Sequence, residues 1–269
     1  MLLGLSASVL LLGLGGESFG ATPAEIQAAI GDFNQAARFR LPRLGSAQLE
    51  ALSAGQTVRV MDQPKEDPES PRRASAFVVV PLPRTQVWVG CQDLHFTQSD
   101  LVQEVKVAGS PLKTTWYGLL DLPRPIADRQ WMVEVIDNAP LALATGDRAW
   151  EHAWNLTGDA EQALALAQAG RLPGVDPAAV AEAVWTPVNQ GAWIAIALSP
   201  EETLLGYHAT STVGGNLPEK LVLQWVHSGL ERLLEGVVQR AREKVPVHYR
   251  AGHSGIVLGA NGKPIPYYP

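Results

Sequence analysis

The side chains best suited to acid–base or metal chemistry are six histidines, which are spread over the chain. No two of them have the HExxH spacing of a helical zinc site, and the only cysteine, Cys91, has no second thiol with which to form one. The chain also lacks a GxSxG segment, a Walker loop and a GxGxxG segment that opens a helix after a strand. The sequence therefore predicts no metal site, no cofactor and no catalytic residue; the histidines are His95, His152, His208, His227, His248 and His253.

His208 is the histidine best placed to serve a ligand, because it lies in the alternating segment LLGYHATST. Neighbouring side chains of a strand point to opposite faces, so either Tyr207 or His208 faces the interior. An inward His208 could orient a polar head group or act as a general base, whereas a hydrogen-bonded histidine within the sheet would do neither. Arg129 could pair with an acidic head group or form a surface ion pair, and Glu104 and Glu134 are expected on the solvent face.

Eight tryptophans supply a second signal. Most of them fall in strand-like segments, and one lies in a long helical segment. Large rigid rings either fill a core or form the wall of a cavity for sterols, isoprenoids or acyl chains, and the sequence leaves both roles open. The residues expected to line such a cavity are Trp116, Trp131, Trp193, Tyr207, His208, Trp225, Gly229 and Leu233.

A long amphipathic helix over Asn216–Glu243 is the element that would close the cavity. Asn216 is a favourable N-cap, and Pro218 fits the first turn. Apolar residues recur at spacings of three and four and so share one face, which includes Leu230 and Leu233. Gly229 lies on the same face, where its small size leaves room for a ligand or for close approach of a sheet. So broad an apolar stripe needs a large hydrophobic surface to cover.

Strand-like segments with short turns precede this helix, which favours antiparallel hairpins over βαβ crossovers. A short helix or turn is expected at Arg84–Gln92, and further helices at Asp159–Ala169 and Pro177–Ala183. The expected strands are Gln56–Met61, Ala74–Val80, Leu101–Ala108, Thr114–Leu122, Gln130–Asp137, Ala149–Thr157, Val184–Val188, Gly191–Leu198 and Thr203–Thr212.

Three segments resemble the START/Bet v 1-like superfamily, also called SRPBCC or helix-grip proteins. Ala74–Trp88 resembles the first strand and the helix after it, Leu122–Val135 resembles a strand with Arg129 at the family's arginine position, and Gly214–Trp225 resembles the start of the terminal helix. Gln130 departs from the pattern, because the family commonly has Asp there. The resemblance covers roughly residues 56–243. It implies an α+β fold in which a curved antiparallel sheet wraps around a long C-terminal helix and encloses an apolar cavity.

The remaining segments suggest how the chain is organised. Leu2–Leu14 is an uncharged apolar run, too short to span a bilayer, followed by small residues up to Ala21. We therefore expect residues 1–20 to be a cleaved signal peptide, with export to the periplasm or outside the cell. Residues 21–55 are expected to be a helical extension with two short helices, and residues 244–269, with four prolines, a loosely packed extended tail.

Composition narrows the choice of function. The net charge of −6 and the absence of a basic patch argue against a nucleic-acid partner. The resemblance implies a START-like protein that binds a lipid or another hydrophobic small molecule, for transport or sequestration, with transient membrane contact. The alternative is a cyclase- or hydrolase-like enzyme that uses His208 or Tyr207 on an apolar substrate. A third hypothesis is a filled core that serves only as an interaction scaffold.

Overall fold

The computed structural model describes residues 20–269 except 64–70, 94, 97–101, 213 and 215–218, and it describes only the backbone of residues 219–228. A nine-stranded sheet forms its centre, with the order β1-β2-β9-β8-β6-β5-β4-β3 and with β7 paired in parallel to β5. All other neighbouring strands are antiparallel. The strands are β1 Val58–Asp62, β2 Arg73–Val80, β3 Val102–Ser110, β4 Lys113–Leu120, β5 Arg129–Asp137, β6 Ala149–Leu156, β7 Val184–Trp185, β8 Val188–Ala197 and β9 Thr203–Thr212.

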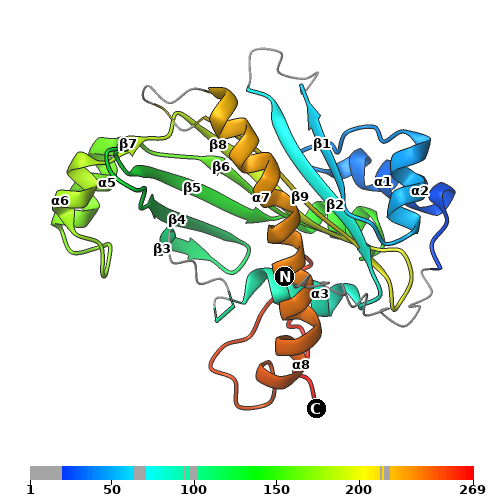
Figure 1. Ribbon diagram of the computed structural model, residues 1–269. Helices are drawn as coiled ribbons and strands as arrows, with labels where there is room; N and C mark the ends of the chain where they lie inside the picture. The colour runs from blue at the N-terminus through cyan, green and yellow to red at the C-terminus, as the bar shows by residue number, and fades with distance from the viewer. Residues whose placement is uncertain (1–19, 64–70, 94, 97–101, 213, 215–218) are drawn as a thin grey trace, which may run out of the picture.

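Helices cover both faces of the curved sheet, and α7 runs obliquely across it (Figure 1). This arrangement confirms the predicted α+β helix-grip architecture. The helices are α1 Pro23–Ala36, α2 Ser46–Ser53, α3 Arg84–Gln92, α4 Ala139–Ala144, α5 Ala160–Gln168, α6 Pro177–Glu182, α7 Glu219–Gln239 and α8 Val245–His248, with a π-helical turn at Arg240–Lys244 between the last two.

Local sequence signals account for most helix starts. Thr22 and Glu25 form a capping box at the start of α1, and Pro23 occupies its first position. Helix α4 was not expected, although Asn138 caps it by accepting a hydrogen bond from the backbone of Leu141. The expected cap of α7, Asn216 with Pro218, lies outside the described residues. No helix within the described part of the chain is long and apolar enough to cross a membrane.

The outer face of the sheet is closed by two groups of helices. Helices α1 and α2 pack over β1, β2, β6, β8 and β9, with Phe33 of α1 among the fully buried residues. Helices α5 and α6 cover β4 and β5 around the buried Tyr117 and Met132. Strand alternation directs Phe77 and Val79 of β2 into this outer core.

The inner face is covered at only one end. Ala76 and Val78 of β2 point inward and meet the buried stripe of α7, which continues into the π-helical turn. Helix α3 packs beside this stripe and closes the same end of the face. Strands β3 to β6 lie beyond α7, so their inner side chains are left to surround a hollow. The stripe consists of Leu230, Leu234, Val237 and Ala241.

The π-helical turn forms where α7 crosses α3 at close range. A Cβ atom on Gly90 would lie 3.1 Å from the Cβ of Ala241, so the glycine permits the two backbones to approach. Gln86 donates its side-chain amide to the carbonyl of Ala241 at 2.8 Å. In the wider turn the backbone N–H of Val245 donates to the carbonyl of Arg240 instead of that of Ala241. The carbonyl of Ala241 is therefore satisfied by Gln86 of the neighbouring helix.

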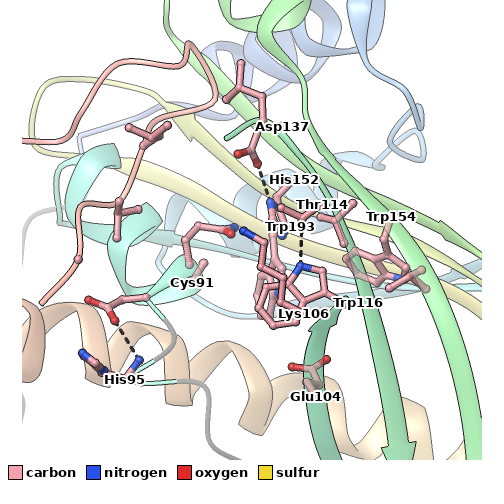
Figure 2. A pocket seen from close by; sticks show the side chains of 18 of the residues that line it. Cys91, His95, Glu104, Lys106, Thr114, Trp116, Asp137, His152, Trp154 and Trp193 are labelled. Atoms are coloured by element: carbon pink, nitrogen blue, oxygen red, sulfur yellow. Dashed lines mark hydrogen bonds and ion pairs between the residues drawn. The ribbon is translucent and has the colours of Figure 1, made fainter. Parts of the chain in front are cut away.

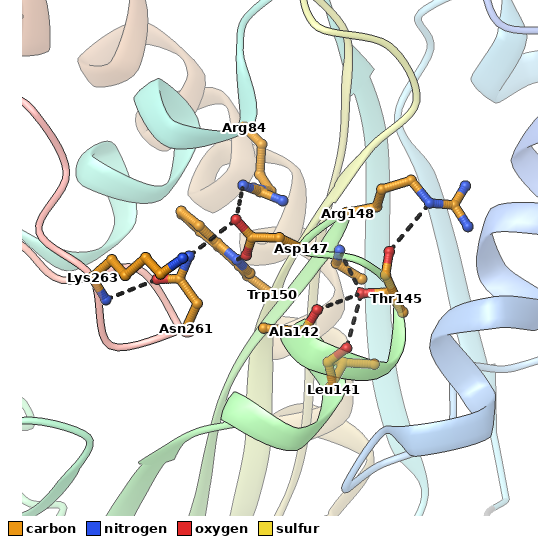
Figure 3. A network of polar contacts seen from close by, with 10 residues as sticks. Arg84, Leu141, Ala142, Thr145, Asp147, Arg148, Trp150, Asn261 and Lys263 are labelled. Carbon is orange, nitrogen blue, oxygen red and sulfur yellow. Dashed lines mark hydrogen bonds and ion pairs between the residues drawn. The ribbon is translucent and has the colours of Figure 1, made fainter.

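The C-terminal tail is firmly packed, and the expectation of a loosely packed extension is wrong. Its Tyr249, Ala260 and Ile265 are buried in a cluster with Trp88 and Trp150. Figure 3 shows the polar part of this attachment around Asp147. That carboxylate accepts hydrogen bonds from the Asn261 amide at 3.0 Å and from Arg84 at 3.5 Å. The Arg84 guanidinium also stacks 3.7 Å from the ring centroid of Trp150.

Candidate functional site

A cavity of about 1130 Å³ occupies the uncovered end of the inner face. Strands β3, β4, β5, β6, β8 and β9 form its floor, the last turn of α3 and the C-terminal half of α7 form one side, and the tail forms another. Figure 2 shows that aromatic and charged side chains project into it from the strands. The cavity is therefore a product of the sheet's curvature and of a helix that covers only part of it.

Strand register arranges the lining in rows across the sheet. One row runs from Asp137 on β5 through His152 on β6 and Trp193 on β8 to Tyr207 on β9. A second row joins Glu104 on β3 to Gly118 and Trp131 on β4 and β5. In both rows the paired residues lie directly opposite each other, so their side chains emerge on the same face.

Two tryptophans of the wall lie over glycines of the neighbouring strand. A Cβ atom on Gly118 would lie only 2.3 Å from the ring of Trp131, and one on Gly191 only 2.5 Å from the ring of Trp154. A larger residue at Gly118 would displace the indole of Trp131, and one at Gly191 would also meet the carbonyl oxygen of His208 at 2.2 Å. The glycines thus allow these rings to lie along the wall, where they present apolar surface without filling the space.

Tyr207 lies at the centre of the aromatic part of the wall. Its ring is 4.6 Å from that of Trp193, edge to face, and 5.6 Å from that of Trp154. Burial, with a smaller contribution from the charge of Glu104, raises the pKa of Tyr207 to about 12. The phenol therefore stays protonated near neutral pH and is a hydrogen-bond donor to a ligand rather than a base.

A charged cluster interrupts the apolar lining. His152 Nδ1 lies 2.6 Å from Asp137 Oδ1, and the two side chains are largely buried. Glu104 projects from β3 into the same space (Figure 2). Burial by the cavity walls raises the pKa of its carboxyl, and the charge of His152 opposes this shift. The lining can therefore hold an apolar body and also exchange protons or hydrogen bonds with a polar group.

Further polar groups gather at the end of the cavity formed by α3 and the π-helical turn. The side-chain nitrogens Gln92 Nε2 and Arg240 Nε are buried and have no hydrogen-bond partner among the described residues. Arg240 also donates Nη1 to the carbonyl of Phe96 at 2.7 Å, which fixes its direction. Cys91 lines this end too, but burial raises the pKa of its thiol to about 12, so it is not a thiolate nucleophile at neutral pH.

The structure brings five of the eight expected cavity residues together in this lining: Trp116, Trp131, Trp193, Tyr207 and Leu233. The side chain of Trp225 lies outside the described residues. Gly229 is not part of the lining, and no described atom lies within 4 Å of the position of its Cβ. The expectation that Gly229 allows close contact with the sheet is therefore wrong, whereas the expectation that it leaves room for a ligand stays a prediction.

His208 is the second correction, because it faces the outer side of the sheet. Its ring packs edge to face against Phe39, with centroids 5.5 Å apart, beneath the N-terminal helices. Burial, together with the charge of Arg73, lowers the pKa of His208 to about 3. The imidazole is therefore neutral and separated from the cavity by the sheet, so it can neither orient a cavity ligand nor act as its base.

Sequence reasoning missed most of the polar lining. Glu104 is exposed, as expected, but it also borders the cavity, which was not foreseen. Arg129, expected at the surface, is buried and donates to the carbonyls of Ala127, Asp128 and Gly214. The signal that was available is the alternation of β6, where His152 stands between Trp150 and Trp154. Because alternate residues of a strand point to the same side, Trp150, His152 and Trp154 indicate a strand face with two aromatic rings and one titratable group.

Comparisons with known proteins agree with this architecture. No protein-family model and no curated protein sequence matches the chain. Among solved structures, human STARD10 superposes with a TM-score of 0.53 at 11% identity, covering 86% of this chain and 84% of that one. Human StAR-related lipid transfer protein 5 superposes with a TM-score of 0.50 at 14% identity, covering 81% of this chain and 95% of that one. The chain therefore has the helix-grip fold of the START/SRPBCC proteins.

Proposed function

We propose that this protein binds one lipid or other hydrophobic small molecule in the inner cavity, for transport or sequestration. The observation that carries the proposal is the cavity of about 1130 Å³, whose wall includes tryptophans packed against glycines. Pockets for drug-sized ligands hold roughly 300–1,000 Å³, so this space suits a larger molecule. Binding would be driven by the removal of apolar ligand surface from water, at about 25 cal/mol per Å².

The chemistry of the lining defines the ligand further. Trp116, Trp154 and Trp193 offer apolar faces, whereas Glu104 and Lys106 place charges at one border of the cavity. We infer an amphiphile with a large apolar body and one polar group. One of the two human proteins of this fold is named a lipid transfer protein, which supports a ligand of this class. We further propose that the chain is exported after cleavage near residue 20 and touches membranes transiently to exchange its ligand.

Native mass spectrometry of protein purified from its own host tests the binding proposal directly. We expect a mass increment of one co-purified apolar molecule per chain, and saturable rebinding of that molecule after extraction. A protein that binds none of a set of sterols, quinones, fatty acids and phospholipids would contradict the proposal. N-terminal sequencing of the same sample tests export, which predicts a mature chain beginning near Ala21.

A pair of leucine variants locates the ligand. Leu233 lines the cavity and Leu143 lies elsewhere on α4, and both are exposed, by 36% and 84%. Leu233→Trp should occupy cavity volume and weaken binding at least about tenfold, or about 1.4 kcal/mol, by calorimetry. Leu143→Trp adds the same side chain outside the cavity and should leave affinity unchanged. Equal affinities of the two variants would place the ligand elsewhere.

A second candidate function is general acid–base catalysis on the bound molecule, which the hydrogen-bonded Asp137 and His152 favour. Because Asp137 holds Nδ1, the ring would exchange a proton at Nε2, and Glu104 supplies a second titratable group in the same cavity. Incubation with ester-bearing lipids, followed by mass spectrometry of products, distinguishes enzyme from carrier. Turnover that is lost in His152→Gln and kept in His248→Gln would establish the enzyme, whereas absence of turnover would reject it.

A further inference from the structure

Three potential metal ligands meet where the tail returns to α3. Asp93 follows the last residue of α3, His95 lies two residues later, and His253 comes from the tail. One ligand atom from each of them lies within 4.8 Å of the others. The rings of His95 and His253 have their centroids 4.7 Å apart. Sequence spacing could not reveal this group, because one ligand stands about 160 residues from the other two.

Two buried atoms of this group face each other without a hydrogen bond. His253 Nε2 lies 3.1 Å from Asp93 Oδ2, and the side chains are 8% and 4% exposed. Neither atom has a hydrogen-bond partner among the described residues. The other ring nitrogen of His253, Nδ1, lies 2.9 Å from the carbonyl oxygen of Gly255, which can only accept. Nδ1 also lies 3.2 Å from the backbone nitrogen of Gly255, which can only donate, so both tautomers of the ring have a partner here. The tautomer with its hydrogen on Nδ1 has a lone pair on Nε2, directed at the carboxylate oxygen of Asp93.

The surrounding hydrogen bonds hold all three side chains in place. The backbone N–H of His95 donates to the other oxygen of Asp93, Oδ1, at 2.9 Å. His95 Nε2 lies 2.9 Å from the hydroxyl oxygen of Ser254. Histidines that ligate metals generally donate their second nitrogen to a carbonyl, carboxylate or water, and the carbonyl of Gly255 is placed to accept from His253 Nδ1 when Nε2 binds a metal. The three side chains are therefore oriented in the manner of metal ligands.

We propose that Asp93, His95 and His253 bind one Zn²⁺ ion. Two imidazoles and one carboxylate are ligands that zinc prefers, whereas Mg²⁺ and Ca²⁺ require oxygen ligands. Zinc bonds of about 2.0–2.1 Å separate neighbouring ligand atoms by roughly 3.3 Å, close to the observed 3.1 Å between His253 and Asp93. The ligand atom of His95 lies within 4.8 Å of the other two, and this exposed side chain can close the remaining distance by a small movement that keeps Nε2 near Ser254.

Three protein ligands leave a fourth position open, and all three residues line the cavity. The open position therefore faces the space that the apolar ligand would occupy, and a water or an oxygen of that ligand completes the coordination. The ion would also fasten the tail to α3, next to the buried cluster around Tyr249. Zinc binding by the protein alone does not depend on the identity of any apolar ligand.

Titration of untagged, chelator-treated protein with zinc chloride tests the proposal. We expect one zinc ion per chain by calorimetry and by elemental analysis, together with a higher melting temperature. His95→Ala should weaken zinc binding by more than about 100-fold, because loss of a supporting residue alone costs 10–100-fold. The exposed position of His95 makes a folded variant the expected outcome.

His248→Ala is the matched control, because His248 is an exposed histidine close to the same surface, with its ring 6.2 Å from that of Phe96. It should bind zinc as the unchanged protein does. Asp93→Asn provides a second test, since it removes the ligand charge while keeping the hydrogen-bond acceptor. Absence of stoichiometric zinc binding, or equal affinities of His95→Ala and His248→Ala, would show that Asp93 and His253 form an ion pair only and would overturn the proposal.

Discussion

The two faces of one sheet are completed in different ways, although the same strands supply both. On the outer face, helices α1 and α2 at one end and α5 and α6 at the other cover a hydrophobic core, in which Phe77 and Ile194 are almost fully buried. On the inner face, one helix covers β1, β2 and β9, and large aromatic side chains stand around a hollow beyond it. The outer face is therefore closed by packing, whereas the inner face leaves the space in which we propose that a ligand binds.

The surroundings of particular buried polar residues also differ between the two faces. On the outer face, the buried Glu151 is satisfied within the protein: it accepts hydrogen bonds from the backbones of Arg38 and Phe39 and from Asn138. On the inner face, buried nitrogens of Gln92 and Arg240 lack partners among the described residues. Unsatisfied buried polar groups are costly, so natural proteins keep them where something else completes them. The outer face also has such atoms, at Ser75 Oγ and His208 Nε2, so the support for a ligand with a polar group comes from the position of Gln92 and Arg240 beside the cavity.

The largest effect expected from this comparison concerns α7, which borders both the packed and the open part of the inner face. Leu230 is buried against β2, whereas Leu233 is 36% exposed in the cavity. Leu230→Asp should destabilise the protein by several kcal/mol, because it buries an unpaired charge. Leu233→Asp should cost far less, contrary to the expectation from helical periodicity alone. Chemical denaturation measures both, and equal losses would mean that the cavity end is packed shut.

The next effect concerns acid stability of the outer face. The pKa of His208 is about 3 in the folded protein and about 6.5 in the unfolded chain, so the unfolded chain binds the proton more readily. The contribution of neutral His208 to the free energy of unfolding is fully present above pH 6.5. It falls by about 1.4 kcal/mol per pH unit as the pH drops toward 3. At pH 4.5 the loss is about 3 kcal/mol.

The His208→Leu variant isolates this contribution. Denaturation of both proteins between pH 7 and 4.5 should show a much shallower decline for the variant. Burial raises the pKa of Glu151, so this carboxyl contributes with the opposite sign: its contribution is present at low pH and lost as the pH rises. The contribution of Glu151 is the same in the unchanged protein and in the variant, so it cancels when their free energies of unfolding are subtracted. Parallel pH profiles would show that His208 has access to solvent.

The sequence was sufficient for the order of the strands and of most helices, α4 excepted, but not for the assignment of faces. The strand Thr203–Thr212 was predicted with its observed bounds, and alternation correctly placed Tyr207 and His208 on opposite sides. Alternation does not say which side is inner, because that depends on where distant helices pack. The N-terminal helices cover the face of the sheet that carries His208, so His208 lies on the outer face.

The polar part of the site could not be found from sequence for a related reason. Asp137 and His152 are 15 residues apart and meet only through the register of β5 and β6, and Asp93 and His253 meet only because the tail folds back. Tail packing depends on contacts such as the hydrogen bond from Trp88 Nε1 to the Leu258 carbonyl at 2.9 Å. A Pro- and Gly-rich composition predicts an irregular segment and gives no information about these contacts.

A third prediction compares two strand glycines covered by aromatic rings on opposite faces. A Cβ on Gly118 would meet Trp131 at 2.3 Å on the inner face, and one on Gly206 would meet Phe77 at 2.9 Å on the outer face. Gly118→Ala and Gly206→Ala should each cost about 1–3 kcal/mol by overpacking. Only Gly118→Ala should also weaken ligand binding, since it moves an indole into the cavity. Similar ligand affinities of the two variants would show that the position of Trp131 does not affect binding.

The smallest expected effect is a gain in stability at Gly229. No described atom lies within 4 Å of the position that its Cβ would take, so an added methyl group meets no obstacle. Within a helix, alanine is favoured over glycine by about 1 kcal/mol, because glycine loses more backbone freedom on folding. Gly229→Ala should therefore raise the free energy of unfolding by up to that amount and leave ligand affinity unchanged. Denaturation and calorimetry on the same samples measure the two quantities. A loss of stability would show that the helix contacts the sheet closely at this position. A loss of affinity would show that Gly229 borders the ligand.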